Sequence, residues 1–153
     1  MLNRRSMIIA SLSVVPAAAC AQSNTGTGTA ITVYKSPSCG CCAAWVDHLR
    51  GSGFKVAVRD MDDVGIVARK AGVPENARSC HTGLAGGYFI EGHVPAADIR
   101  RLLRERPRAR GLSVPGMPMG SPGMEQGNRK QPYNTLIIDR GGTARVFARH
   151  NQA

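Results

Sequence analysis

The chain has 153 residues and a formal net charge of +10, with 42% hydrophobic and 5% aromatic residues. This length is sufficient for one domain with a hydrophobic core of its own. With a single tryptophan and few other aromatic residues the chain offers no base-stacking platform. We therefore expect no nucleic-acid partner and interpret the charge as favouring solubility or contact with an anionic membrane surface.

The N-terminal segment has the residue order of a secretory signal peptide. A pair of arginines precedes the apolar run 7–15, and small residues follow up to Ala21. The run is too short to span a bilayer, so we expect no integral membrane segment in the mature chain. We predict a signal peptide over residues 1–21 and a periplasmic location. The arginine pair also fits a twin-arginine signal, and Cys20 would allow lipoprotein anchoring as an alternative.

After the signal the chain predicts one α/β domain. Residues 22–30, rich in Ser, Asn, Thr and Gly, predict a flexible leader, and the domain covers 31–150. Hydrophobic periodicity and capping residues predict these elements in chain order: strand 31–34, helix 39–49, strand 54–59, helix 62–71, strand 88–90, helix 95–106 and strands 133–138 and 143–148. The segments 74–87 and 111–131 predict loops. We expect a mixed sheet with flanking helices and a C-terminal β-hairpin.

Three thiols lie within one turn of chain at the start of the first predicted helix. Cys39-Gly40-Cys41-Cys42 contains a Cys-x-x-Cys, a Cys-x-Cys and a vicinal pair. A strand, a loop and a Cys-x-x-Cys at a helix N-terminus is a thioredoxin-like arrangement, which predicts a thioredoxin-like fold. The partial positive charge of the helix N-terminus stabilises a thiolate, which improves it both as a metal ligand and as a leaving group. The motif alone therefore leaves metal binding and disulfide exchange open.

The third clustered cysteine favours a metal site. Four cysteines in an exported chain are typical of two structural disulfides, but the adjacent Cys41 and Cys42 do not readily bond each other. A dithiol oxidoreductase needs only two sulfurs, and the spacing does not match ferredoxin patterns. One tetrahedral zinc ion needs four ligands spread around it. Three clustered thiolates and a fourth from Cys80 favour several bridged Cu(I) ions.

Two further segments carry candidate ligands. Cys80-His81 lies in a predicted loop, and His81 could either ligate a metal or donate a hydrogen bond to a neighbour. The segment 116–124 is rich in Gly, Pro and Met, and thioethers bind Cu(I) without deprotonation. The remaining histidines are interpreted as ordinary surface or core residues: His48, His93 and His150. The predicted metal ligands are Cys39, Cys41, Cys42, Cys80, His81, Met117 and Met119.

Together these motifs resemble a known family. The resemblance rests on the segments 39–42 with the strand before it, 79–82, 91–96, 114–118 and 122–125. It extends from about Ile31 to His150. They resemble domain-of-unknown-function family 411, which includes CopG-like bacterial copper-resistance proteins. The resemblance implies a thioredoxin-like fold, export and copper binding by the clustered cysteines. It also implies a proline facing the cysteine loop, often after a cis bond, for which Pro118 is the candidate.

The sequence thus predicts a periplasmic protein that holds Cu(I) for copper resistance or transfer. Its partners would be copper ions and other periplasmic copper-handling proteins. We predict no catalytic residue for this function. The alternative is a thiol–disulfide oxidoreductase that uses Cys39 and Cys42.

Overall fold

A computed structural model describes residues 28–152 of the chain. The predicted signal peptide and most of the predicted leader lie outside these residues. The elements are β1 (Ala30–Lys35), α1 (Gly40–Gly51), β2 (Lys55–Asp60), α2 (Gly65–Ala71), the 3-10 helix η1 (Glu75–Ala77), β3 (His81–Ala85), β4 (Tyr88–Gly92), α3 (Ala96–Glu105), β5 (Ala109–Val114), β6 (Tyr133–Asp139) and β7 (Ala144–His150).

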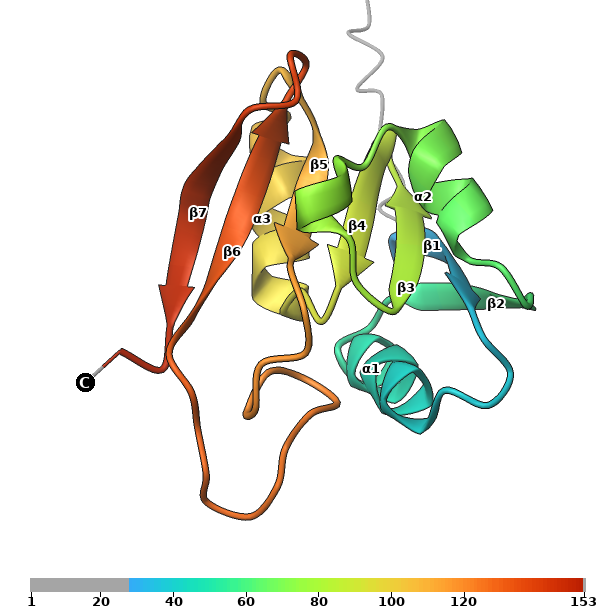
Figure 1. Cartoon of the computed structure of the whole chain (residues 1–153), viewed down its shortest axis with the longest axis vertical. Coiled ribbons are helices and arrows are strands. Elements are labelled where there is room, and N and C mark those ends of the chain that lie inside the picture. Colours follow the sequence, from blue (N-terminus) through green and yellow to red (C-terminus); the bar gives the residue numbers. More distant parts are fainter. Residues whose placement is uncertain (1–27, 153) are drawn as a thin grey trace, which may run out of the picture.

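The strands form one seven-stranded sheet in the order β2-β1-β3-β4-β5-β6-β7 (Figure 1). The β1–β2 and β4–β5 pairs are parallel, and the other four neighbouring pairs are antiparallel. The prediction of a mixed sheet with flanking helices and a C-terminal β6–β7 hairpin is therefore confirmed. The thioredoxin-like description itself stays a prediction, which rests on the strand-loop-helix order of β1 and α1.

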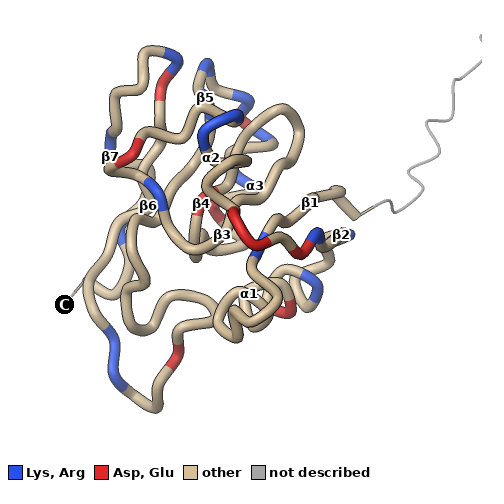
Figure 2. Tube along the Cα trace, turned by 45° about the vertical axis from the view of Figure 1, so that its right-hand side comes forward, with Lys and Arg blue, Asp and Glu red and all other residues tan. Residues whose placement is uncertain are grey.

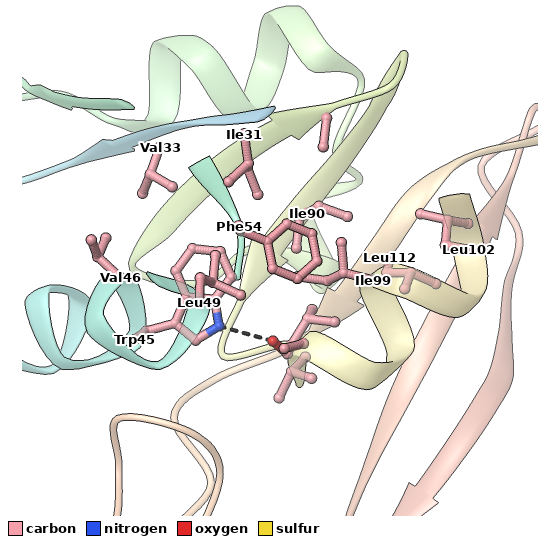
Figure 3. Close-up of a cluster of buried hydrophobic side chains, with 14 of the residues drawn as sticks. Ile31, Val33, Trp45, Val46, Leu49, Phe54, Ile90, Ile99, Leu102 and Leu112 are labelled. Carbon is pink, nitrogen blue, oxygen red and sulfur yellow. Dashed lines mark hydrogen bonds between the residues drawn. The ribbon is translucent and has the colours of Figure 1, made fainter. Parts of the chain in front are cut away.

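Helices α1 and α3 cover one face of the sheet, where the larger hydrophobic core lies. Figure 3 shows Trp45 and Leu49 of α1 close to strand residues of this core, with Ile99 of α3 beside them. The strand residues on this face include Ile31, Val33, Ile90, Leu112 and Ile137. Alternation along the strands sends Phe89 and Ile138 to the other face, against α2 and η1, in a smaller cluster. The fold is thus a three-layer arrangement with α1 and the cysteines at one end of it.

Two strands lie where the sequence predicted loops. β3 occupies part of the predicted loop 74–87, and β5 extends into the predicted loop 111–131. β3 has the sequence His-Thr-Gly-Leu-Ala, in which polar residues and a glycine hide the apolar alternation. Both strands are interior members of the sheet, so pairing on both sides stabilises them in spite of weak local propensity.

The surface carries basic residues on several elements rather than in one run. Figure 2 shows Lys and Arg on the helices, on the C-terminal hairpin and in the loop after β5, with neutral segments between them. Acidic residues gather between β2 and α2, where Asp60 pairs with Lys35 at 3.0 Å. Among the described residues no helix is long and apolar enough to cross a membrane.

Candidate metal centre

The first turn of α1 presents the clustered cysteines. Cys39 is the N-cap residue in an extended conformation, and its carbonyl oxygen accepts the N–H of Ala43 at 3.2 Å. Cys39 and Cys42 form a disulfide with their Cα atoms 5.3 Å apart. Cys42 is fully buried under the helix, whereas Cys41 is half-buried and has a free thiol. Adjacent residues of a helix point in different directions, so the sulfur of Cys42 is buried whereas that of Cys41 is partly exposed.

Cys80 reaches the same place from the sheet. Strand β3 pairs with β1 in antiparallel register, with His81 opposite Lys35, so the residue before β3 lies beside the loop that follows β1. The sulfur atoms of Cys39, Cys41, Cys42 and Cys80 all lie within 4.8 Å of one another. The free thiol of Cys41 lies with its Sγ 3.5 Å from Sγ of Cys39. Sheet pairing thus brings together four sulfurs that the sequence separates into two groups.

Two buried histidines face Cys80. Its Sγ atom lies 3.3 Å from Nδ1 of His81 and 3.3 Å from Nε2 of His93. These three residues form a second group with ligand atoms within 4.8 Å of one another, and it shares Cys80 with the cysteine group. Both rings are fully buried, and that of His81 also lies against Trp45, with centroids 4.3 Å apart.

Burial favours the neutral form of both histidines. Burial lowers the pKa of His81 to about 3, with the neighbouring His93 adding to the effect. Burial likewise lowers the pKa of His93, although its hydrogen bond to Pro122 and the charge of Glu125 act in the opposite direction. His81 Nε2 is buried and makes no hydrogen bond to any described residue. Neutral imidazole is the form that ligates metals, so both rings fit that role.

Cys80 is held as a thiol in the absence of metal. Burial raises its pKa to about 11, and the hydroxyl of Ser79 acts against this, with the two residues' side chains 3.9 Å apart. The single hydroxyl hydrogen of Ser79 has a closer acceptor in the carbonyl oxygen of Gly116, at 2.6 Å. Because a metal binds the thiolate, ion binding at Cys80 must release this proton.

The loop between β5 and β6 packs against the site. Figure 1 shows it running beside α1, on the left of the helix in that view. Gly123 has φ +85°, and a Cβ there would lie 2.7 Å from the carbonyl oxygen of Cys41 and 2.7 Å from the nitrogen of Trp45. Glycine is therefore required for this close approach. Nδ1–H of His93 donates to the carbonyl oxygen of Pro122 at 2.8 Å, which leaves Nε2 unprotonated toward Cys80.

The predicted methionine ligands lie in this loop. Met117 comes directly after Gly116, whose carbonyl oxygen accepts a hydrogen bond from Ser79, and Met117 is 54% exposed. Met119 is half-buried, and its backbone exchanges hydrogen bonds with Gln131 at 2.9 Å in both directions. Their role as ligands stays a prediction. The expectation of a cis bond at Pro118 is wrong, because residues 28–152 contain no cis peptide bond.

Comparison with known proteins identifies the family. Residues 77–124 match the family model "Protein of unknown function, DUF411". Two solved structures of copper resistance protein CopG, form 2 and form 1, are similar to this chain. Form 2 is 48% identical over 80% of this chain and 98% of its own, with a TM-score of 0.77. The chain belongs to the DUF411 family. Form 1 is 47% identical over 82% of this chain and 99% of its own, also with a TM-score of 0.77. No curated protein matches the chain.

The DUF411 match includes a candidate ligand that sequence reasoning missed. His93 was interpreted as an ordinary histidine because it stands alone in the sequence, yet its ring faces Cys80. The available signal was its position directly after β4. Because β4 pairs with β3 and Glu91 lies opposite Thr82, a residue just after β4 must lie near one just before β3. The β3–β4 pairing could not be predicted from the sequence, because the segment 74–87 that contains β3 was predicted to be a loop.

Proposed function

We propose that this chain binds copper as Cu(I) through Cys39, Cys41, Cys42 and Cys80, for copper resistance or transfer. The observation that carries the proposal is the gathering of four sulfur atoms within 4.8 Å of one another. Thiolates are soft ligands that select Cu(I) over hard cations. The similarity to structures of copper resistance protein CopG supports copper as the cargo.

The two overlapping ligand groups favour more than one ion. Cys80 belongs both to the four-sulfur group and to the group with His81 and His93. A thiolate sulfur can bridge two Cu(I) ions, so Cys80 is suited to join a sulfur-rich part of the site to a nitrogen-containing part. The neutral imidazoles add no charge to a site that already holds several thiolates.

Binding by all four sulfurs requires the Cys39–Cys42 disulfide to be reduced. Two electrons and two protons convert that disulfide into two thiols, which lose their protons as copper binds. With the disulfide intact, only Cys41 and Cys80 offer free thiols among the described residues. Copper capacity therefore depends on the redox state of this pair.

The place of action that we propose is the periplasm. The signal-like N-terminus and the relation to copper resistance proteins support it. In that compartment the chain would receive copper from, or pass it to, other copper-handling proteins through the half-buried Cys41 and the exposed Met117.

A Cu(I) titration tests the proposal. Protein reduced with a phosphine, then freed of it, is titrated with Cu(I) against a chromogenic Cu(I) chelator. We expect more than one ion per chain, and loss of this capacity in the triple variant Cys39→Ser, Cys41→Ser, Cys80→Ser. His150→Ala serves as the control, because His150 bonds Asp98 in another part of the fold. Undiminished stoichiometric binding by the triple variant would contradict the site.

A second candidate function is thiol–disulfide exchange by Cys39 and Cys42. The observation that favours it is the disulfide between them at the N-terminus of α1. In this reaction a substrate dithiol would be oxidised while the Cys39–Cys42 disulfide is reduced, or the reverse. Insulin reduction by metal-free protein with dithiothreitol as the electron source tests it. Turnover that is lost in Cys39→Ser but kept in Cys41→Ser would favour this function.

A further inference from the structure

Glu91 is a buried carboxylate directly behind the Cys80-His81 pair. Its side chain belongs to β4 and is 1% exposed. Oε1 accepts the backbone N–H of Ser79 at 2.7 Å, and Oε2 accepts the hydroxyl of Thr82 at 2.7 Å. Ser79 and Thr82 are the two residues that flank Cys80-His81. One carboxylate therefore holds both ends of the segment that carries these two side chains.

Strand pairing makes this arrangement specific. Glu91 lies directly opposite Thr82 in the β3–β4 ladder, which places its carboxylate at the start of β3. The next residue, Gly92, has φ +70°, and a Cβ on it would lie 2.7 Å from Cβ of Ser79. The residue after that, His93, faces Cys80. Three consecutive residues thus contact the segment 79–82: Glu91 binds it, Gly92 leaves room for it and His93 faces its cysteine.

Burial of a carboxylate costs free energy unless the charged group is paired or hydrogen-bonded. No Lys, Arg or His within residues 28–152 lies at ion-pair distance from Glu91. The charge of Arg78 favours the carboxylate from beyond that distance, and the direct compensation for burial is the pair of hydrogen bonds from Ser79 and Thr82. Hydrogen bonds that a carboxylate accepts are shorter and stronger than neutral ones, and both distances here are 2.7 Å. The consequence is a rigid Ser79–Thr82 segment in front of the cysteine cluster.

We propose that Glu91 is a positioning residue of the metal centre, which fixes Cys80 and His81 toward Cys41 and His93 through its bonds to Ser79 and Thr82. The inference rests on the proposed copper binding at Cys80, because the role assigned to Glu91 is to orient a metal ligand. Glu91 itself does not ligate copper.

Substitutions at Glu91 separate geometry from charge. Glu91→Ala removes both acceptors and should weaken Cu(I) binding by about 10- to 100-fold, as loss of outer-shell partners does in metal sites. Glu91→Gln keeps an acceptor for Ser79 and a polar group for Thr82, so it should restore most of the affinity. The side chain in Glu91→Asp is too short to reach both residues, so this variant should not restore the Cu(I) affinity. An equal loss in Gln and Ala would overturn the positioning role.

A pair of identical substitutions controls for general loss of stability. Thr82 and Thr135 are both fully buried strand residues, and each donates its hydroxyl to a buried carboxylate. Thr82→Val removes a bond to Glu91, whereas Thr135→Val removes one to Asp98. We expect Thr82→Val to weaken Cu(I) binding and Thr135→Val to leave it unchanged. Equal effects would mean that Glu91 has only a structural role.

A measurement without copper keeps the two proposals separate. In metal-free protein with the Cys39–Cys42 disulfide intact, iodoacetamide labelling of Cys80 and Cys41 is followed by peptide mass spectrometry. Glu91→Ala and Thr82→Val should accelerate labelling of Cys80 severalfold while labelling of Cys41 stays unchanged. This result in a protein that binds no Cu(I) would overturn the proposed function and retain the positioning of Cys80. Unchanged Cys80 labelling in a protein that binds Cu(I) would overturn the role of Glu91 alone.

Discussion

The Nδ1 atom of His93 lies 2.8 Å from the carbonyl oxygen of Pro122, 29 residues further along the chain. This bond joins the end of β4 to the long loop between β5 and β6. It leaves Nε2 of the same ring 3.3 Å from Cys80 Sγ. A loop that the sequence marks only by its Met, Gly and Pro content thereby orients a candidate metal ligand.

Removal of the His93 ring should weaken copper binding. His93→Ala should lower Cu(I) affinity on the order of tenfold or more, because the site loses one of the two imidazole nitrogens that lie 3.3 Å from Cys80 Sγ. Competition with a chromogenic Cu(I) chelator measures this change. His150→Ala is the matched control, since that imidazole bonds Asp98 at 2.9 Å and lies in neither ligand group. Equal affinities for wild type and His93→Ala would exclude His93 as a ligand.

The close approach of the β5–β6 loop to α1 should make Gly123 intolerant of a side chain. Gly123→Ala would place a Cβ 2.7 Å from backbone atoms of Cys41 and Trp45, in addition to the strain of its positive φ. Gly127→Ala is the control, because Gly127 has φ +57° and no atom within 4 Å of the added Cβ. We expect a loss of about 1 kcal/mol in unfolding free energy for Gly127→Ala and clearly more for Gly123→Ala. Denaturant unfolding measures both, and similar losses would mean that the loop does not pack on α1.

The indole of Trp45 should contribute through its hydrogen bond as well as its volume. Its Nε1–H donates to the carbonyl oxygen of Val94 at 2.9 Å inside the core, as the dashed line in Figure 3 shows. Trp45→Phe leaves that buried carbonyl unpaired, which costs about 1–3 kcal/mol on top of the lost volume. Tyr88→Phe removes a donor to Pro107 at a half-buried position, where water can replace it. Chemical denaturation should therefore show a much smaller loss for Tyr88→Phe, and equal losses would contradict this account.

Metal-free protein should lose stability in acid because of His81. Burial lowers the pKa of His81 from 6.5 to about 3, so in that interval the unfolded chain binds a proton that the folded chain does not. Stability therefore falls as pH falls from 6.5 toward 3. The lowered pKa of His93 acts in the same direction. Burial raises the pKa of Glu91, so its contribution is present at low pH and is lost as pH rises, which opposes part of the effect.

The comparison of wild type with His81→Gln isolates this contribution. Denaturant unfolding at about pH 6 and about pH 4 should give a steeper loss for wild type, with an excess of at most about 1.4 kcal/mol per pH unit. Identical slopes for the two proteins would show that His81 is solvated or hydrogen-bonded as a cation in the folded state.

Local patterns were sufficient for the elements with clear amphipathic periodicity. The spacing of Ile99 and Leu102 predicted α3, the alternation of Phe54, Val56 and Val58 predicted β2, and two glycines after Arg140 predicted the final turn. β3 and β5 were missed because their stability comes from neighbouring strands on both sides. The error mattered for the site, since β3 is the strand that brings Cys80 to the helix.

The sequence by itself determined that three thiols lie at the start of a helix, because that placement depends only on adjacent residues and on helix-forming pattern. Only the tertiary structure decided which distant groups meet them. Cys80, His93 and Glu91 come together through the pairing of β1, β3 and β4, and Pro122 through a loop that lacks any periodic pattern. Such contacts depend on strand register and on the backbone freedom of Gly92 and Gly123, which no single segment specifies.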